Sequence, residues 1–391
     1  MSLNFPAILI GGPPHSGKSV LVYSITQALR DRKISHYALR ACPDGEGDWS
    51  NEIPQPMVRN LRVKGCFSDE FTQTVIRFLE KRHLPLLVDV GGRPNEAQQR
   101  IFSHCTHAIL VVGERENDPT AYKNDLSSWR EMMIQQGVPI IAEIQSTLNG
   151  QNEILASTSE LLIGRQQGLE RGSFASGVTF DVLVEQIATH ITFDEQRLAA
   201  EHQQLCPPGT EFIDLPKLAA QLGNGDRFWQ PEELSLILAH IQPDKPLAAY
   251  GRSAIWSYVA LSLHIYPAQF YSFDAKLGWV MPPALQERET QREKDDWNIK
   301  LVHHEIYSEL KMNATSQYLD IAEPDKIPLL SIPNDKGLML SGRLPIWLYC
   351  AVARHYAEQA AWIACYQPFL NGGVVVYSTT PDVAVGDVIS H

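Results

Sequence analysis

Short apolar runs alternate with longer amphipathic stretches along the first half of the chain. The apolar runs lie at residues 7–10, 36–39, 84–90, 108–112 and 138–144, and helical periodicity is found at residues 20–30, 70–81 and 127–136. Strands that are apolar on both faces and alternate with helices are typical of a parallel sheet covered by helices on both sides. The pattern therefore predicts an α/β domain over residues 1–195. The charged stretch at residues 197–209, which ends in Pro-Pro-Gly, is interpreted as a linker.

The second half of the chain contains an internal repeat. The sequence GRSAIWSY at residues 251–258 recurs as GRLPIWLY at residues 342–349, and residues 251–264 are identical to residues 342–355 at 7 of 14 positions. Each copy predicts a Gly-Arg turn, an amphipathic helix, an apolar strand (269–273 and 361–366) and a turn into another strand. We interpret the repeat as two tandem small α/β domains, at residues 209–285 and 298–391. Between them, residues 286–297 are dense in charge and predict a solvated linker or helix.

Composition and charge narrow the range of partners. With 44% hydrophobic and 20% charged residues the chain is typical of a globular protein, and its apolar runs are too short to cross a bilayer, so we expect no membrane contact. The N-terminal segment lacks the features of a secretion signal, and six cysteines without a Cys-x-x-Cys pair indicate reduced thiols in the cytoplasm. A net charge of -12 disfavours a long nucleic acid as partner. An anionic ligand must therefore be small or held in a local basic pocket.

A phosphate-binding loop follows the first apolar run. The octapeptide GPPHSGKS at residues 12–19 fits G-x-x-x-x-G-K-[ST] between a predicted strand and a predicted helix. Glycines allow backbone N–H groups to face phosphates, the lysine reaches the outer phosphates, and the final serine is a ligand for Mg²⁺. The pattern predicts a nucleotide site in which the contacting residues of the loop are Gly12, His15, Ser16, Gly17, Lys18 and Ser19.

The same mechanism requires a second metal ligand on a neighbouring strand. Asp89 supplies it at the end of an apolar run, and Asp89 to Gly92 resembles the D-x-x-G segment that senses the terminal phosphate. We therefore expect Mg²⁺ to be held by Ser19 and Asp89. ATP is preferred to GTP by default, because no base-specificity motif follows residues 138–144. The order of these segments resembles the group that includes dethiobiotin synthetase and the MinD-like ATPases. The acidic loop at residues 44–48 is either a functional loop that steers the metal or a solvated turn.

The repeated Gly-Arg turns have the composition of anion sites. Gly251 with Arg252, and Gly342 with Arg343, each precede a helix, so a guanidinium and a helix N-terminus converge. Two such turns related by pseudo-twofold symmetry suit a ligand of matching symmetry, such as a cyclic oligonucleotide. The alternative is that the glycine serves the turn and the arginine caps a carbonyl. The helices that follow carry aromatic and histidine residues, which we interpret mainly as packed side chains: Trp256, Tyr258, His264, Trp347, Tyr349 and His355.

The segment GLMLSGRLPIWLYC at residues 337–350 resembles the central motif of the CRISPR-associated Csx-three family. The similarity continues through HYA at 355–357, GGVVV at 372–376 and VGDVI at 385–389, and it covers residues 298–391 well and 209–285 more weakly. The resemblance implies small α/β dimers of type III CRISPR systems that bind cyclic tetra-adenylate between dimers and cleave it, with Mn²⁺ stimulating some nuclease activity. It thus implies a ring nuclease, here with the two copies forming one pseudo-dimer, and a homo-oligomer.

The chain departs from the family pattern where the family places its reacting groups. The family signature at this point is Tyr-Asp-Pro-Arg-Leu-Gly. In the second copy of this chain, Gln367 and Phe369 stand where the signature has Asp and Arg, whereas the first copy has Asp274 and Lys276 there. Catalysis of the family type would therefore rest on Asp274 and Lys276. The alternative is a sensor in which both copies only bind the cyclic oligoadenylate and an NTPase or kinase-like activity of the first domain is the output.

Overall fold

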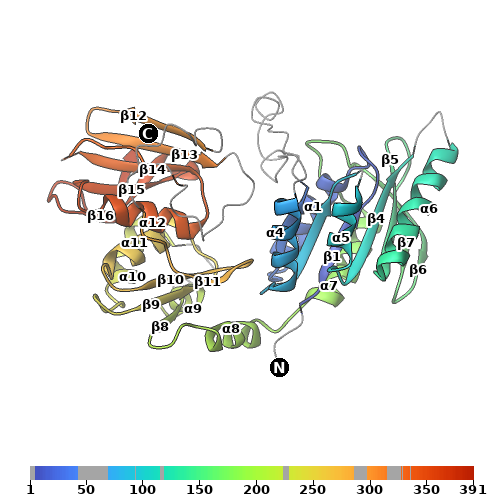
Figure 1. The fold of residues 1–391 in the computed structure, drawn as a ribbon, viewed down its shortest axis with the longest axis horizontal. Coiled ribbons are helices and arrows are strands. Elements are labelled where there is room, and N and C mark those ends of the chain that lie inside the picture. Colours follow the sequence, from blue (N-terminus) through green and yellow to red (C-terminus); the bar gives the residue numbers. More distant parts are fainter. Residues whose placement is uncertain are drawn as a thin grey trace. The chain divides into compact units, whose positions relative to one another are not determined.

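The computed structural model describes residues 5–42, 69–92, 94–114, 119–222, 229–285, 297–314, 327, 329–334 and 336–391. The chain divides into two compact units (Figure 1), Met1–His202 with Ala275–Leu277 and Gln203–Asp274 with Gly278–His391. The acidic loop at 44–48 and the charged residues 286–296 lie outside the described residues. Among the helices of the described segments, none is both long and apolar enough to cross a bilayer.

The first unit is built on a seven-stranded sheet, called sheet A. Its strands are β1 (Ala7–Gly11), β2 (Tyr37–Ala41), β3 (Leu86–Val90), β4 (His107–Gly113), β5 (Ile140–Thr147), β6 (Glu153–Ser157) and β7 (Leu162–Gln167). Their order is β2-β3-β1-β4-β5-β7-β6, and every pair is parallel except the antiparallel pair of β6 with β7. The predicted parallel α/β architecture is thus confirmed.

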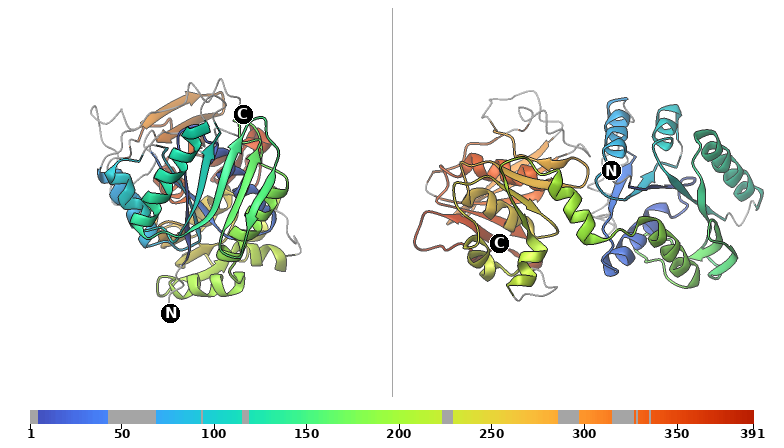
Figure 2. Two further views of the ribbon diagram at one scale, coloured as in Figure 1. Left: turned by 90° about the vertical axis from the view of Figure 1, so that its right-hand side faces the viewer. Right: turned by 90° about the horizontal axis from the view of Figure 1, so that it is seen from below.

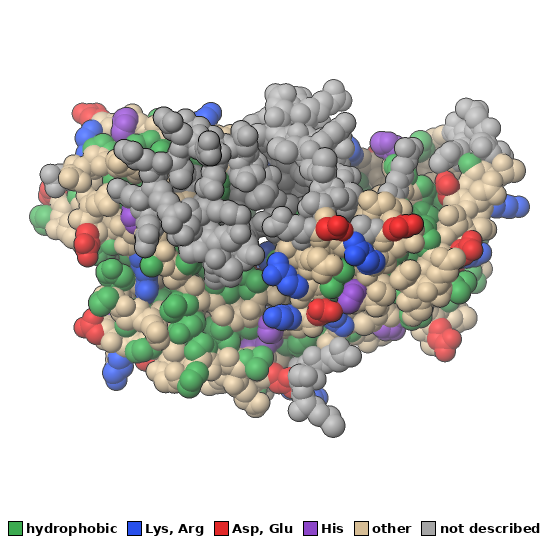
Figure 3. Space-filling view, viewed as in Figure 1, with side chains coloured by type: hydrophobic (Ala, Val, Ile, Leu, Met, Phe, Trp, Pro, Cys, Tyr) green, Lys and Arg blue, Asp and Glu red, His purple; other side chains and the backbone are tan. Residues whose placement is uncertain are grey.

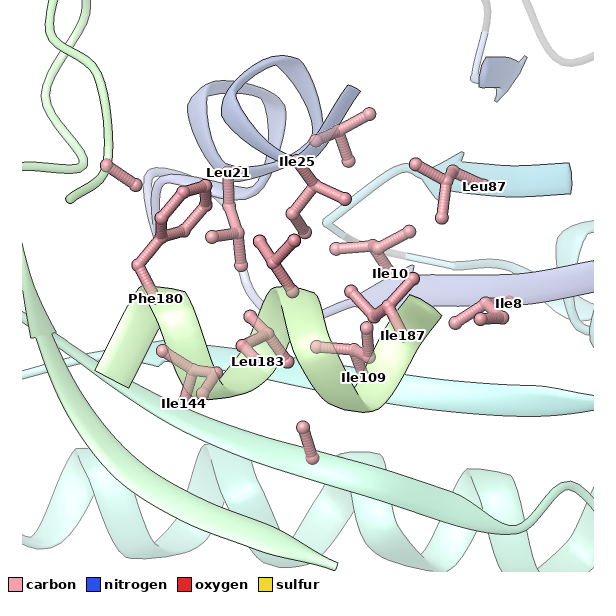
Figure 4. Packing of buried hydrophobic residues seen from close by; sticks show 14 of the residues in the cluster. Ile8, Ile10, Leu21, Ile25, Leu87, Ile109, Ile144, Phe180, Leu183 and Ile187 are labelled. Carbon is pink, nitrogen blue, oxygen red and sulfur yellow. The ribbon is translucent and has the colours of Figure 1, made fainter. Parts of the chain in front are cut away.

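Helices cover both faces of sheet A (Figure 2), as the wholly apolar strands require. They are α1 (Lys18–Asp31), α4 (Asp69–Glu80), α5 (Glu96–Phe102), α6 (Pro119–Gln136) and α7 (Val178–Ile191). Figure 4 shows the core on one face, where Leu21 and Ile25 of α1 and Leu183 and Ile187 of α7 point toward Ile10 and its neighbours on the sheet. This packing fixes the start of α1, and with it the loop that precedes α1, against the end of β1.

A helix occupies most of the stretch that the sequence indicated as a linker. Helix α8 spans Glu195–Gln204 and is capped by Asp194, whose side chain accepts a hydrogen bond from the Arg197 N–H at 2.7 Å. The boundary between the two compact units falls after His202, within the predicted linker, of which residues 197–204 are helical. Their high charge hides an apolar face, because Leu198 and His202 are buried within the first unit.

The second unit contains two sheets. Sheet B has the order β11-β10-β9-β8 and consists of β8 (Glu211–Asp214), β9 (Leu247–Tyr250), β10 (Phe270–Asp274) and β11 (Gly278–Val280). Sheet C has the order β12-β13-β14-β15-β16-β17 and consists of β12 (Trp297–His303), β13 (Tyr307–Ala314), β14 (Gly337–Arg343), β15 (Trp362–Gln367), β16 (Gly372–Ser378) and β17 (Val388–Ser390). Residues 304–306 form the turn from β12 into β13.

The two sheets share one connectivity. In β8-β9-β10-β11 and in β13-β14-β15-β16, the first three strands are parallel and the fourth is antiparallel. Helix α11 (Ile255–His264) follows β9, and α12 (Ile346–Tyr356) follows β14. The smaller elements of sheet B's half are α9 (Leu215–Gln221), η1 (Pro231–Glu233) and α10 (Leu234–Leu238), and η3 (Pro368–Leu370) joins β15 to β16.

Helices α11 and α12 lie between the two sheets (Figure 1). They contact each other, and each also reaches the other half, since α11 contacts β15 and β16 and α12 contacts β10. The guanidinium of Arg354 on α12 joins them by donating to the carbonyls of Ser262 and Ala268 at 2.8 and 3.0 Å. Because the helices fill the space between the sheets, the outer faces of sheets B and C point in opposite directions.

Candidate functional site

The loop between β1 and α1 can be formed only with glycine at two positions. Gly12 has φ +148°, and a Cβ there would stand 1.8 Å from the Val111 carbonyl oxygen. Gly17 is the left-handed N-cap of α1 at φ +85°, and a Cβ there would stand 2.4 Å from the Cβ of Leu169. The loop is therefore held tightly against β4 and the segment after β7, with the N-terminus of α1 at its end.

Lys18 is the cation of this loop. Its side chain is buried, and Nζ donates to the Pro13 carbonyl at 2.7 Å and lies 3.5 Å from Ser16 Oγ. Ser16 is buried as well, whereas His15 is exposed with φ +64°. The ammonium is thus folded over the backbone of the loop itself, which is where a bound phosphate would receive its charge.

The two predicted metal ligands lie side by side. Ser19 Oγ donates to Asp89 Oδ2 at 3.1 Å, and Asp89 is buried at the end of β3. Gly92 brings the segment after β3 against the loop, because a Cβ at Gly92 would stand 2.4 Å from the Pro14 nitrogen. A hydroxyl and a carboxylate adjacent to a phosphate cradle are the donor set that Mg²⁺ takes from proteins, since it completes its shell with phosphate oxygens and water. These residues therefore fit both a nucleotide and the ion.

Arg40 belongs to this site and was missed by the sequence analysis. Its guanidinium lies 3.6 Å from Asp89 Oδ2, with only 15% of the side chain exposed. Arg40 is directly opposite Asp89 in the β2–β3 register. The signal available in the sequence was a basic residue immediately after the second apolar run, but the strand order that brings it to Asp89 could not be derived from the chain alone.

The two Gly-Arg turns of the second unit are built alike. Gly251 has φ +97° and Gly342 has φ +118°, and a Cβ would stand 2.4 Å from Pro216 Cδ at the first and 1.9 Å from the Met312 carbonyl oxygen at the second. Each turn leads into a helix whose N-cap is extended, with φ −66° in both copies. Glycine is thus required at both positions by conformation and by space.

A buried tyrosine hydroxyl holds each turn. Tyr258 donates to the carbonyl of Gly251, and Tyr349 donates to the carbonyl of Gly342 at 2.8 Å. Burial raises the pKa of both hydroxyls, so they remain protonated donors. Both tyrosines and the tryptophans two positions before them are buried, which confirms their interpretation as packed residues. The same contact is thus present at both turns.

The arginines of the turns are exposed. Arg252 and Arg343 present their side chains at the surface, and the backbone N–H of Arg343 donates to Asn313 Oδ1 at 3.1 Å. In sheet B the turn after β9 lies at the same edge as the end of β10, because these strands are parallel. Arg252 and Asp274 are therefore placed at one edge of sheet B, on adjacent strands.

The two residues expected to react lie in one hairpin. Asp274 is the last residue of β10 and pairs with Gly278 of β11, and Lys276 lies in the turn between them. In the second copy, Gln367 ends β15 and the Phe369 side chain is 97% exposed in η3. Asp274 and Gln367 thus end the third strands of the two shared strand orders, and Lys276 and Phe369 lie in the connections that follow them.

A row of aromatic rings crosses sheet B and was not recognised in the sequence. Each strand contributes one half-buried ring, and neighbouring centroids are 5.2 to 6.2 Å apart: Phe212 of β8, Tyr250 of β9, Phe273 of β10 and Trp279 of β11. Figure 3 shows hydrophobic side chains gathered on the surface over the region of α10, β9 and β10. Rings in such a row have the faces on which nucleobases stack.

Comparisons with known proteins agree with the sequence resemblance at the C-terminus. The family model of the CRISPR-associated protein (Cas_csx3) matches residues 313–390. An uncharacterized protein of Aquifex aeolicus (strain VF5) is 34% identical over 103 residues, which are 26% of this chain and 91% of that protein.

Solved structures similar to parts of the chain include a GTPase and two FtsY proteins. A GTPase of Pyrococcus abyssi in its apo form has TM-score 0.24 and 12% identity, over 36% of this chain and 68% of that one. The cell division protein FtsY of Thermotoga maritima has TM-score 0.25 and 13% identity, over 36% of this chain and 52% of that one. The signal recognition particle receptor FtsY of Elizabethkingia anophelis has TM-score 0.28 and 9% identity, over 51% of this chain and 66% of that one.

The family model falls on the C-terminal part, where the Gly342–Arg343 turn and strands β14 to β17 of sheet C are found. Through these residues the chain belongs to the family of the CRISPR-associated protein Cas_csx3.

Proposed function

We propose that this protein binds and degrades a cyclic oligoadenylate, cyclic tetra-adenylate in the first instance, under the control of an ATP-binding first unit. The observation that carries the proposal is the pair of Gly-Arg turns, since each has a strained glycine, a tyrosine-held carbonyl and an exposed arginine before a helix. The common strand order of sheets B and C supports their origin as tandem copies. A ligand with repeated phosphates and adenines matches two such turns and a row of aromatic rings.

The first unit is proposed to bind ATP with Mg²⁺. Backbone N–H groups of residues 12–18 and the ammonium of Lys18 would hold the phosphates, and Ser19 with Asp89 would hold the ion. When bound, Mg²⁺ neutralises charge on the phosphate oxygens. Arg40 places a second cation beside Asp89, in a position to respond to the terminal phosphate.

Cleavage is proposed to use the ribose 2′-hydroxyl of the ligand as nucleophile. The 2′-hydroxyl gives its proton to water as its oxygen attacks the adjacent phosphorus. The bond to the 5′ oxygen breaks while that oxygen takes a proton from water, which leaves a 2′,3′-cyclic phosphate and a 5′-hydroxyl. Negative charge grows on the phosphate oxygens during this step, so a fixed cation beside them lowers the barrier. In the first copy Lys276 would provide that cation, and Asp274 would orient the hydroxyl or hold Mn²⁺.

Incubation of the purified protein with labelled cyclic tetra-adenylate tests the proposal. Linear products ending in a cyclic phosphate are expected, and the double variant Asp274→Ala, Lys276→Ala is expected to form them more slowly while still binding the ring. The matched control is Gln367→Ala with Phe369→Ala, which removes the neutral counterparts and should change neither binding nor rate. A ring that is bound but never cut by the parent protein would contradict the degradation.

A sensor is the second candidate function. It is favoured by Gln367 and by the fully exposed Phe369, which have neither the charge nor the proton-transfer capacity of the family residues. A sensor would bind the ring without cutting it, and the ring would change the rate of ATP hydrolysis by the first unit. The same incubation, with released phosphate measured in parallel, separates the two functions.

A further inference from the structure

The outer face of sheet C carries a buried carboxylate that none of the sites above uses. Glu309 of β13 is only 5% exposed, and it lies beside the apolar residues Tyr307 and Met339. Removing a carboxylate from water is costly unless strong hydrogen bonds replace its hydration. A hydrophobic residue would suit this face better if packing were the only requirement.

Two side chains satisfy the two oxygens of Glu309. Ser341 Oγ on β14 donates to Oε1, and His391 Nε2 lies 3.2 Å from Oε2. Burial raises the pKa of Glu309, but the hydrogen bonds with Ser341 and His391 and the charge of Lys311, together with that of His391 when it is protonated, more than offset burial, so the pKa lies below its ordinary value. Glu309 is therefore an anion, and an anion only accepts hydrogen bonds.

The carboxylate fixes the tautomer of His391. The proton of the neutral imidazole is on Nε2, directed at Glu309, and Nδ1 is the nitrogen that can take a proton from another molecule. The His391 side chain is 35% exposed, and its ring lies 5.0 Å from the Tyr366 ring. Lys311, two residues after Glu309 on the same strand, is exposed. The carboxylate of Glu309 that positions the imidazole is thus buried, whereas the His391 imidazole itself is accessible.

We propose that Glu309 and His391, with Lys311, form a second acid–base site, which cleaves the phosphodiester of an oligoadenylate on the outer face of sheet C. His391 is the catalytic base and Glu309 is a positioning residue. This inference rests on the proposed function, and it assigns to the second copy a reacting group in place of those lost at Gln367 and Phe369.

The proposed step balances with these side chains alone. Nδ1 of His391 takes the proton of the ribose 2′-hydroxyl as the 2′ oxygen forms its bond to phosphorus. The bond from phosphorus to the 5′ oxygen breaks, and that oxygen takes a proton from the Lys311 ammonium. The imidazolium then gives its proton to water and the lysine regains one, so both side chains return to their starting states.

The experiment uses the full chain with labelled cyclic tetra-adenylate, in the background of Asp274→Ala with Lys276→Ala. Cleavage that persists in this background is assigned to the second site. Adding His391→Ala should lower that remaining rate at least ~100-fold, the usual scale for losing an acid–base group, and imidazole added to the buffer should restore part of it. The matched control is His240→Ala, another exposed histidine of the same unit, which should leave the rate unchanged.

Glu309→Gln separates positioning from folding. A glutamine keeps the acceptor for Ser341 but directs N–H donors at His391, which forces the proton onto Nδ1 and removes the base. The variant should fold, bind the ring with unchanged affinity and lose kcat rather than KM. A remaining rate that is insensitive to His391→Ala, or is absent from the double-variant background, would overturn the inference. A parent protein that cuts nothing would instead contradict the proposed function.

Discussion

Replacing the tyrosine of each Gly-Arg turn by phenylalanine removes one oxygen and nothing else. In the parent protein Tyr349 donates to the Gly342 carbonyl at 2.8 Å, and Tyr258 donates to the Gly251 carbonyl. The buried ring stays in place in both variants. The carbonyl, in contrast, loses its partner in a turn that is already constrained by a positive φ at the glycine.

The size of the effect follows from the surroundings of the carbonyl. A buried acceptor left without a donor costs about 1–3 kcal/mol. Because both glycines are only half-buried, water can partly replace the hydroxyl, and the lower end of this range applies. We expect each variant to lower the free energy of unfolding of the second unit by about 1 kcal/mol, and the two losses to add. The affinity for cyclic tetra-adenylate should fall about fivefold for each loosened turn, the equivalent of that energy.

Urea unfolding followed by tryptophan fluorescence measures the stability, and titration calorimetry measures the affinity. Tyr271→Phe is the control, because the Tyr271 hydroxyl on β10 makes only an exposed local contact with Gln269 at 3.4 Å. Loss of stability in only one of the two variants would mean that the turns are not equivalent. If affinity for the ring is unchanged in both, the turns do not hold the ligand.

Three further outcomes follow from the structure. Lys18→Ala should abolish ATP binding in calorimetry because the loop loses its buried cation, and unchanged affinity would contradict the nucleotide site. Arg252→Ala and Arg343→Ala should each weaken binding of the cyclic ring by about 1.5–3 kcal/mol, the scale of a charged hydrogen bond; an effect at one arginine alone would restrict the ligand to one copy. Burial lowers the pKa of His202 from 6.5 to about 4, although its bond to the His83 carbonyl opposes this. The unfolded chain therefore takes up the proton first, and the first unit should lose up to about 3 kcal/mol of stability as pH falls from 6.5 to 4. In acid titrations followed by circular dichroism, His202→Gln should flatten this dependence, and an equal slope in both proteins would refute it.

The strands of sheet A could be predicted where a short run of the sequence is apolar throughout. Strands β1, β3, β4 and β5 are apolar on both faces, so their positions follow from composition alone. Helix α8 could not be predicted in this way, because its charged residues are as numerous as its three buried residues, Leu198, Ala199 and His202. No element could be predicted from the sequence at residues 145–194, where β6, β7 and α7 lie. There half-exposed strands mix polar and apolar residues without a clear period.

The residues of the candidate sites could likewise be predicted only where they belong to a local sequence motif. The phosphate loop is a local motif, so Lys18 and Ser19 could be assigned from sequence, and the Ser19–Asp89 contact agrees with the predicted metal ligands. Arg40 could not be assigned, because its proximity to Asp89 depends on strand order.

The group on the outer face of sheet C shows the same limit more clearly. Glu309 and His391 are 82 residues apart, and they meet only because β13 and the residue after β17 reach the same face of sheet C. Pairs of this kind carry no signal in a single sequence. The internal repeat could be recognised because the Gly-Arg turn and its tyrosine are local and occur in both segments.

Mass spectrometry of the products formed from cyclic tetra-adenylate by the parent protein tests the central claim most directly. We expect linear oligoadenylates that end in a 2′,3′-cyclic phosphate, and their rate of formation should change when ATP and Mg²⁺ are added and stay constant for Lys18→Ala. Recovery of the intact ring after prolonged incubation, with or without ATP, would contradict the claim that the protein degrades it.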